Sequence, residues 1–137
     1  SGLKIDVRYR DMNGAPLDPQ SVAVSTDFYA VVTITNTSGY ERYADLALTH
    51  IVPAGWEITS ERDLSAVTYQ DIRDDRVLSY FDLRSGESKE IPIKLTATYK
   101  GRYYLPSVYC EAMYDNSVRA LRKGEWIEVV GQTPAGN

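Results

Sequence analysis

The most regularly patterned stretch of the chain is EIPIKLTATY, from Glu90 to Tyr99. Apolar side chains occupy every second position in it, and a period of two is typical of a β-strand with one buried face. The alternation turns five residues inward: Ile91, Ile93, Leu95, Ala97 and Tyr99. Pro92 lacks a backbone N–H, so its place on the outer side favours a sheet edge or the start of a strand. Turn sequences around Gly86 and Gly101 flank the stretch, which therefore predicts a strand between two hairpin turns.

The same alternation extends in both directions from this stretch. It is found in segments 3–9, 28–36, 43–52, 67–72, 77–83, 103–105, 107–114 and 126–130. Turn sequences such as Asn13-Gly14 and Pro53-Ala54-Gly55 separate these segments, and none of them has the apolar period of an amphipathic helix. The sequence therefore predicts an all-β fold, an antiparallel immunoglobulin-like β-sandwich of about seven to nine strands.

Two of the predicted strands carry the chain's only histidine and only cysteine. From 43 to 52, the alternation places His50 on an inward face together with Ala44, Leu46, Leu48 and Val52. From 107 to 114, it places Cys110 on an inward face together with Val108, Ala112 and Tyr114. We therefore expect both residues to be part of the core, His50 with its hydrogen bonds satisfied and Cys110 as a small buried hydrophobe.

A chain of 137 residues is long enough for one domain with a single core. We assign the domain to residues 3–130, interpret Ser1-Gly2 as a remnant of expression, and expect a flexible tail over 131–137. The net charge is −4, with no stripe of basic residues, which excludes nucleic acid as a partner. No apolar run approaches the roughly 20 residues of a membrane-spanning helix, so direct membrane insertion by this domain is not expected.

The residue types needed for known chemistries are too few or wrongly spaced. A zinc site needs several histidine or cysteine ligands, and a phosphate site needs a glycine-rich loop that opens a helix. An internal thioester at Cys110 would need a glutamine near the thiol, but Glu111, Ala112 and Met113 follow it. We predict no catalytic residue, no metal and no cofactor. A small hydrolase that uses His50 is a minor alternative, which would need an acid and a nucleophile beside the ring.

Charged residues gather in one predicted turn. Asp71, Asp74 and Asp75 alternate there with Arg73 and Arg76. The two arginines compete with any calcium ion for the carboxylates, so we favour ion pairs within a polar corner over a calcium site. A second polar group follows the cysteine and contains Glu111, Tyr114 and Asp115. We predict that the two groups form one structural cluster or inter-domain contact.

The chain is also rich in tyrosine, with 11 tyrosines against 2 phenylalanines and 2 tryptophans. Five aromatic residues are candidates for an exposed platform that binds sugar or protein: Trp56, Tyr103, Tyr104, Tyr109 and Trp126. Packing in the core or in an interface is the commoner role of such residues. The platform nevertheless supports an alternative reading of the chain as a stand-alone surface module, an adhesin or a carbohydrate-binding domain.

Three stretches carry a resemblance to a known family: YQDIRDDRV at 69–77, GRYYLP at 101–106 continuing into CEAMYD at 110–115, and KGEWIEV at 123–129. In this order they resemble the last macroglobulin domain (MG10) of bacterial alpha-2-macroglobulins, the counterpart of the receptor-binding domain in animal members. Weaker similarity extends over 3–9 and 52–58. The resemblance implies a macroglobulin-type β-sandwich.

The resemblance also implies a function for the parent protein. Alpha-2-macroglobulins trap proteases: a bait region is cleaved, the molecule changes shape, and a thioester in another domain couples to the protease. By this resemblance, the domain is a non-catalytic module that contacts the thioester domain and neighbouring macroglobulin domains, and meets target proteases only through the full-length chain. The same resemblance implies a location in the cell envelope, periplasmic or anchored to a membrane through the parent. Receptor binding is not carried over, because the lysines that animal relatives use for it do not map onto identified positions of this sequence.

Overall fold

The alternation predicts extended chain throughout, and the computed structural model, which describes residues 2–132, consists of strands and connecting loops. Twelve strands are found in the described part: β1 (Leu3–Asp11), β2 (Ser21–Ala23), β3 (Asp27–Asn36), β4 (Tyr43–Ile51), β5 (Trp56–Ile58), β6 (Tyr69–Ile72), β7 (Arg76–Leu83), β8 (Ser88–Ala97), β9 (Gly101–Leu105), β10 (Val108–Ala112), β11 (Asp115–Arg122) and β12 (Glu125–Val130). None of the described residues forms a helix that could cross a membrane. Ser1 and residues 133–137, which include most of the predicted tail, lie outside the described residues.

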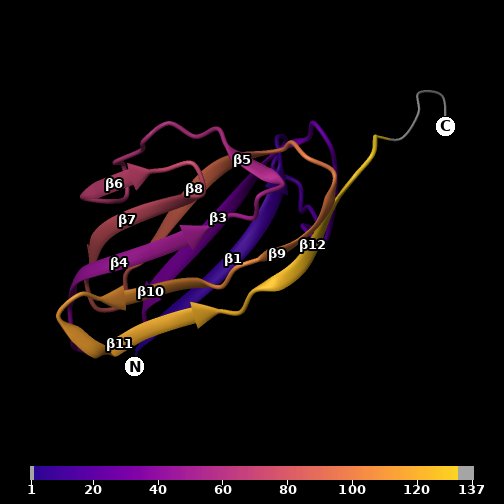
Figure 1. Cartoon of the computed structure of the whole chain (residues 1–137). Helices are drawn as coiled ribbons and strands as arrows, with labels where there is room; N and C mark the ends of the chain where they lie inside the picture. Colours follow the sequence, from indigo (N-terminus) through magenta and orange to yellow (C-terminus); the bar gives the residue numbers. More distant parts are fainter. Residues whose placement is uncertain (1, 133–137) are drawn as a thin grey trace.

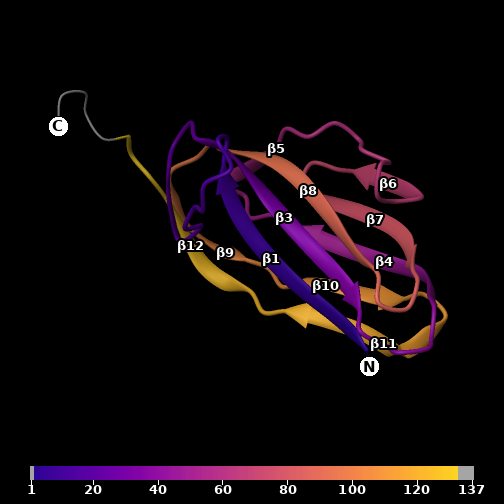
Figure 2. The same cartoon turned by 180° about the vertical axis from the view of Figure 1, so that it is seen from behind.

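The strands form a four-stranded sheet in the order β1-β3-β8-β5 and a five-stranded sheet in the order β11-β10-β4-β7-β6. Neighbours within both sheets are antiparallel. The two sheets form opposite layers of a sandwich (Figures 1 and 2). The predicted antiparallel β-sandwich is therefore confirmed. The strand number exceeds the prediction because the short strands β2 and β5 and the polar strand β11 have too few apolar alternations to be recognised.

A third sheet, in the order β2-β12-β9, continues the five-stranded sheet at one end (Figure 1). The chain crosses from β9 into β10 at Pro106 and from β11 into β12 at Gly124. Pro106 has no N–H to continue the ladder. Gly124 has no room for a side chain, because a Cβ there would lie 2.4 Å from the carbonyl oxygen of Leu105. Within this sheet β2 pairs with β12 in parallel over three residues, an exception that the antiparallel prediction did not contain.

The core lies between the sheets. Along β3 and β8, the alternate residues Ala30, Val32, Ile34, Leu95 and Ala97 are fully buried. At one end of the core Trp56 packs its ring edge-on against Phe28, with centroids 5.0 Å apart, and against Tyr9 at 5.9 Å. Pro92 lies on the outer side of β8 where only β3 pairs, because β5 reaches only Leu95–Ala97. Its missing N–H is tolerated there.

Three predicted orientations are wrong, each because a strand is irregular or ends early. Ala44 is exposed and Tyr43 is buried instead, because β4 has a bulge between Tyr43 and Leu46, with Asp45 at a φ of 54°. Tyr99 is exposed because β8 ends at Ala97. Tyr114 is exposed because β10 ends at Ala112 and the chain turns into β11. Strict alternation cannot indicate where a register shifts or stops.

Candidate interaction surface

The first predicted polar group forms the hairpin between β6 and β7. Arg73 Nε lies 3.0 Å from Asp71 Oδ2, and two nitrogens of Arg76 each lie 3.0 Å from an oxygen of Asp75. The hydrogen bond from Arg76 holds the pKa of the Asp75 carboxyl below its usual range. These pairs are exposed to solvent, where ion pairs add little stability. Asp74 lies at the tip of the turn and is exposed. The ion pairs predicted for this corner are therefore present.

The second predicted polar group lies around the turn between β10 and β11. Glu111 faces Arg119 of β11 and Ala47 of β4 across the ladder. Asp115 Oδ1 accepts hydrogen bonds from the backbone N–H and the hydroxyl of Ser117, and these bonds lower the pKa of the carboxyl. Tyr114 stands at the turn with 83% of its side chain exposed. The group is thus an ordered turn with an aromatic side chain at its tip.

The structure does not bring the two groups together. Asp75 accepts a backbone hydrogen bond from Val52, just past one end of β4, whereas Met113 donates one to Asp45 near the other end. The groups therefore lie at opposite ends of the five-stranded sheet (Figure 1). That each group contacts another domain stays a prediction.

An apolar and aromatic surface lies between the two polar groups, on the outer side of the five-stranded sheet. It contains Ala47, Tyr69, Leu78, Tyr80, Tyr109 and Leu121, and we call it the tyrosine face. Leu121 is 58% exposed and Tyr69 is 51% exposed, and the rings of Tyr69 and Tyr80 lie 5.7 Å apart. A hollow of about 440 Å³ opens beside Tyr109 and Leu121, with Glu111 and Arg119 in its lining. Contiguous exposed apolar side chains of this kind mark surfaces that contact other molecules.

The proposed aromatic platform is divided by the fold. Trp56 is buried in the core, and Tyr103 packs against Gly55, where a Cβ would lie 2.3 Å from its ring. Tyr104 and Trp126 remain exposed as a pair on the three-stranded sheet, with ring centroids 5.4 Å apart. The guanidinium of Arg102 lies 4.4 Å from the Trp126 ring centre. Only these two rings form a compact exposed aromatic site among the five.

His50 and Cys110 both lie in the core, as predicted. Burial lowers the pKa of His50 to about 4 and raises the pKa of the Cys110 thiol to about 12. Contrary to the expectation of a satisfied histidine, His50 Nε2 has no hydrogen-bond partner in the described part of the chain. No group of three or more histidine, cysteine or acidic residues among 2–132 is placed to hold a metal ion.

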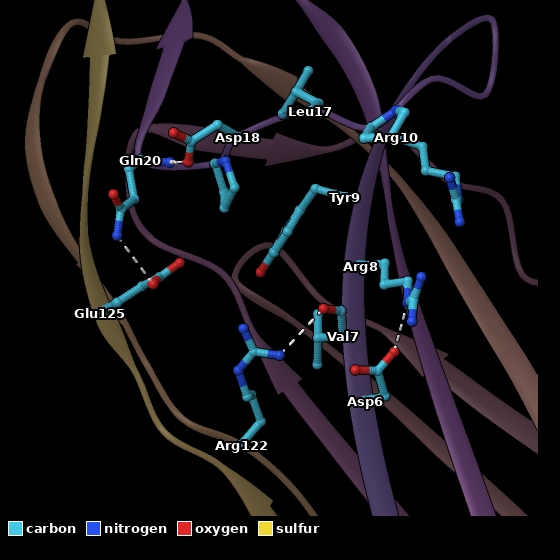
Figure 3. Close-up of a pocket in the computed structure, with 12 residues that line it drawn as sticks. Asp6, Val7, Arg8, Tyr9, Arg10, Leu17, Asp18, Gln20, Arg122 and Glu125 are labelled. Carbon is cyan, nitrogen blue, oxygen red and sulfur yellow. Dashed lines mark hydrogen bonds and ion pairs between the residues drawn. The ribbon is translucent and has the colours of Figure 1, made fainter.

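A further hollow, of about 590 Å³, was not foreseen from the sequence. It lies between β1 and the start of β12 and is bordered by the loop that leads to β2 (Figure 3). The side chains of Tyr9, Gln20, Arg122 and Glu125 converge on it from separate elements (Figure 3). No local sequence signal connects residues so far apart, because the site exists only when the fold places β1, the loop before β2 and the start of β12 around one hollow.

Comparison with known proteins agrees with this architecture. Residues 2–116 match the family profile described as the bacterial alpha-2-macroglobulin MG10 domain. The chain is 30% identical over 131 residues to an alpha-2-macroglobulin of Pasteurella multocida, covering 90% of this chain and 7% of that protein. It is 26% identical to an alpha-2-macroglobulin homolog of Yersinia pestis, covering 91% of this chain and 8% of that protein. The chain therefore spans less than a tenth of the length of these curated relatives.

Solved structures show the same fold. A mutant of Salmonella alpha-2-macroglobulin superposes with a TM-score of 0.84 at 18% identity, covering 95% of this chain and 9% of that one. Native Escherichia coli alpha-2-macroglobulin, in a structure from domain MG7 to the C-terminus, superposes with a TM-score of 0.83 at 16% identity, covering 95% of this chain and 24% of that one. On the match of residues 2–116 to the family profile, this chain belongs to the bacterial alpha-2-macroglobulin MG10 domain family.

Proposed function

We propose that this chain is a non-catalytic interaction module of a protease-trapping alpha-2-macroglobulin, and that its tyrosine face packs against another domain of the same parent protein. The observation that carries the proposal is the exposed apolar and aromatic character of this face, in which Leu121 is 58% and Tyr69 is 51% exposed. Leaving such side chains in water is unfavourable by about 25 cal/mol per Å² of apolar surface, so a covering partner gains that stabilisation.

The two polar groups fit the same role. The Asp71–Arg76 hairpin lies at one end of the tyrosine face, and the turn with Tyr114 and Asp115 lies at the other. Charged residues at the rim of an interface contribute more to orientation and specificity than to affinity. In this proposal they fix the register of the partner domain, while the apolar side chains between them supply most of the affinity.

The parent protein supplies the reactive parts of the trap. One related structure is described as trypsin-activated Escherichia coli alpha-2-macroglobulin, and another as Salmonella alpha-2-macroglobulin reacted with methylamine. By analogy, the parent of this chain responds to proteases and carries an amine-reactive group outside this domain. Cys110 is unsuited to that role, because its thiol is buried and its pKa is raised. We further propose that the parent resides in the cell envelope, which fractionation of cells that carry a tagged parent protein tests.

The experiment uses the full-length parent with the double substitution Tyr69→Ser and Leu121→Ser. A matched control carries Val31→Ser and Thr33→Ala on the outer side of the four-stranded sheet. We expect the tyrosine-face variant, but not the control, to incorporate methylamine faster and to lose the change in native-gel mobility that follows trypsin treatment. Equal behaviour of both variants and the unmodified parent would exclude this face as an inter-domain contact.

A stand-alone binding module is the second candidate, and the exposed pair of Tyr104 and Trp126 favours it. Exposed aromatic rings stack on sugar rings, but Arg102 already lies over the Trp126 ring at 4.4 Å. A glycan array with the chain and its Trp126→Ala variant separates the two candidates. Binding that depends on Trp126 would support the sugar-binding module.

A further inference from the structure

We propose that the hollow between β1 and β12 binds an extended peptide segment, which hydrogen-bonds to the Val7–Tyr9 edge of β1 and places a carboxylate beside the Tyr9 hydroxyl and the Arg122 guanidinium. The hollow lies away from the tyrosine face, so the inference does not rest on the function proposed above. Its volume of about 590 Å³ is in the range of ligand-binding clefts.

The edge of β1 is the first element of the site. β1 is the outermost strand of its sheet and pairs with β3 on one side only. Residues 9 and 11 direct their backbone groups to the other side, because Tyr9 O accepts a hydrogen bond from Leu17 N at 3.0 Å and Asp11 N donates one to Ala15 O at 2.8 Å. In a strand, alternate residues direct their N–H and C=O groups to the same side. The N–H groups of Val7 and Tyr9 therefore point into the hollow.

Part of this edge of β1 already pairs with an extended segment of the same chain. Residues 15–17 lie along 9–11 as a short antiparallel bridge, so a peptide strand is sterically compatible with this side of β1. Further along, Arg122 Nη1 donates to Val7 O at 3.2 Å (Figure 3), in the position where the N–H of a neighbouring strand would donate. The open stretch between these two contacts is about 7 Å long, the spacing of two residues in a strand. A peptide that also replaces Arg122 at Val7 O and reaches the Val7 N–H needs three or four residues, and strand addition to a free edge is a common mode of peptide binding.

The Tyr9 hydroxyl is the second element. The side chain is only 8% exposed, and its hydroxyl points into the hollow without a hydrogen-bond partner among the described residues (Figure 3). Burial raises the pKa of this phenol, and the nearby Glu125 carboxylate raises it further, so the group stays a hydrogen-bond donor. The hydroxyl is therefore free to donate to an acceptor on a ligand that enters the hollow.

Most charged side chains around the hollow already have a partner, and Arg122 is the cation beside Tyr9 that a negatively charged acceptor could reach. Arg8 pairs with Asp6 at 2.9 Å, Glu125 accepts a hydrogen bond from Gln20 Nε2 at 3.4 Å, and Asp18 accepts one from Gln20 N at 2.9 Å. Arg122 lies near Tyr9 without an ion pair among the described residues, and its hydrogen bond to Val7 O is to a neutral carbonyl. When a peptide N–H donates to Val7 O in place of Arg122, the guanidinium becomes free to bind a carboxylate.

The test is an NMR titration of the ¹⁵N-labelled chain with the acetylated, amidated peptide Thr-Val-Asp-Val-Thr and its counterpart with asparagine in place of aspartate. We expect the aspartate peptide to slow hydrogen exchange at the Val7 and Tyr9 amides, but not at the Arg8 amide, which faces β3. Arg122→Gln weakens the aspartate peptide about tenfold and the asparagine peptide much less, as loss of one charge-assisted hydrogen bond predicts. Tyr9→Phe weakens both peptides, whereas Glu125→Gln strengthens the aspartate peptide.

The control variant is Arg42→Gln, which removes an exposed arginine that pairs with Asp82 outside the hollow. It is expected to leave both affinities unchanged. Amides of Val7 and Tyr9 that are already as protected as that of Arg8 in the free chain would overturn the proposal. So would equal binding of the two peptides with no effect of Arg122→Gln, or no shift with either peptide up to its solubility limit.

Discussion

The outer faces of the two large sheets differ sharply, although their inner faces are alike. On the four-stranded sheet, β1 presents Lys4, Asp6, Arg8 and Arg10 to solvent, and β3 adds threonines beside them. On the five-stranded sheet, the equivalent surface is the tyrosine face. Both inner faces consist mainly of buried aliphatic and aromatic residues, to which the five-stranded sheet adds the buried polar side chains of His50, Gln70 and Ser79. Since a polar outer face is sufficient for a stable sandwich, the tyrosine face is not required by the fold and points to a partner.

The first prediction tests whether the inner faces are equivalent. Phe28 on β3 and Phe81 on β7 are both almost completely buried, on opposite sheets. Either change, Phe28→Ala or Phe81→Ala, is expected to lower the free energy of unfolding by about 3–5 kcal/mol, because each removes a large side chain and leaves a cavity. Urea denaturation measures both. If only one variant lost less than about 1 kcal/mol, the residues around that phenylalanine would be able to close the cavity, and the inner faces of the two sheets would not be equivalent.

The second prediction concerns His50, the buried polar ring on the inner face of the five-stranded sheet. Its pKa is about 4 in the folded state against 6.5 for the ordinary group, so the unfolded state binds more protons between these values. Stability is therefore complete above pH 6.5 and falls as the pH drops towards 4, by on the order of 3 kcal/mol. His50→Leu removes this dependence. The free energies of unfolding at pH 7.5 and pH 4.5 are measured for the unmodified chain and the variant. If the variant loses as much stability between these pH values as the unmodified chain, the loss comes from carboxylates and not from His50.

The third prediction tests the break between the five-stranded and three-stranded sheets. Gly124→Ala places a Cβ against the Leu105 carbonyl and the Tyr104 ring, so the backbone must shift, at a cost of about 1–3 kcal/mol. Gly39→Ala is the control, because nothing lies within 4 Å of its Cβ position. Thermal denaturation compares the two. Equal melting temperatures would mean that the crossing at Gly124 has room to adjust.

Prediction from the sequence was most successful for regular strands, where each residue's place in the alternation determines which face of the sheet it occupies. The period of two in 90–97 correctly predicted a strand of the core, because burial of one sheet face imposes that pattern directly, but β8 as a whole is not the edge strand that Pro92 suggested, because it lies between β3 and β5. It missed β2 and β5, which have three residues each and too few alternations to detect. It also grouped Glu111 with the Asp71–Arg76 hairpin, which the register separates. The hollow around Tyr9 was not predicted for a related reason: β1, the loop before β2 and the start of β12 come together around it only in the folded chain.

The last prediction concerns the tyrosine face in the isolated chain, where no partner covers it. Tyr69→Ser and Leu121→Ser change side chains that are about half exposed, so each is expected to alter the free energy of unfolding by no more than about 0.5 kcal/mol. The same substitutions in the full-length parent are expected to have a larger effect, because the partner domain then loses apolar contact. Urea denaturation of the chain, beside methylamine incorporation by the parent, separates the two contributions. A large loss of stability in the isolated chain would mean that these side chains hold their own sheet together, and the contrast between the two outer faces would then have a structural cause.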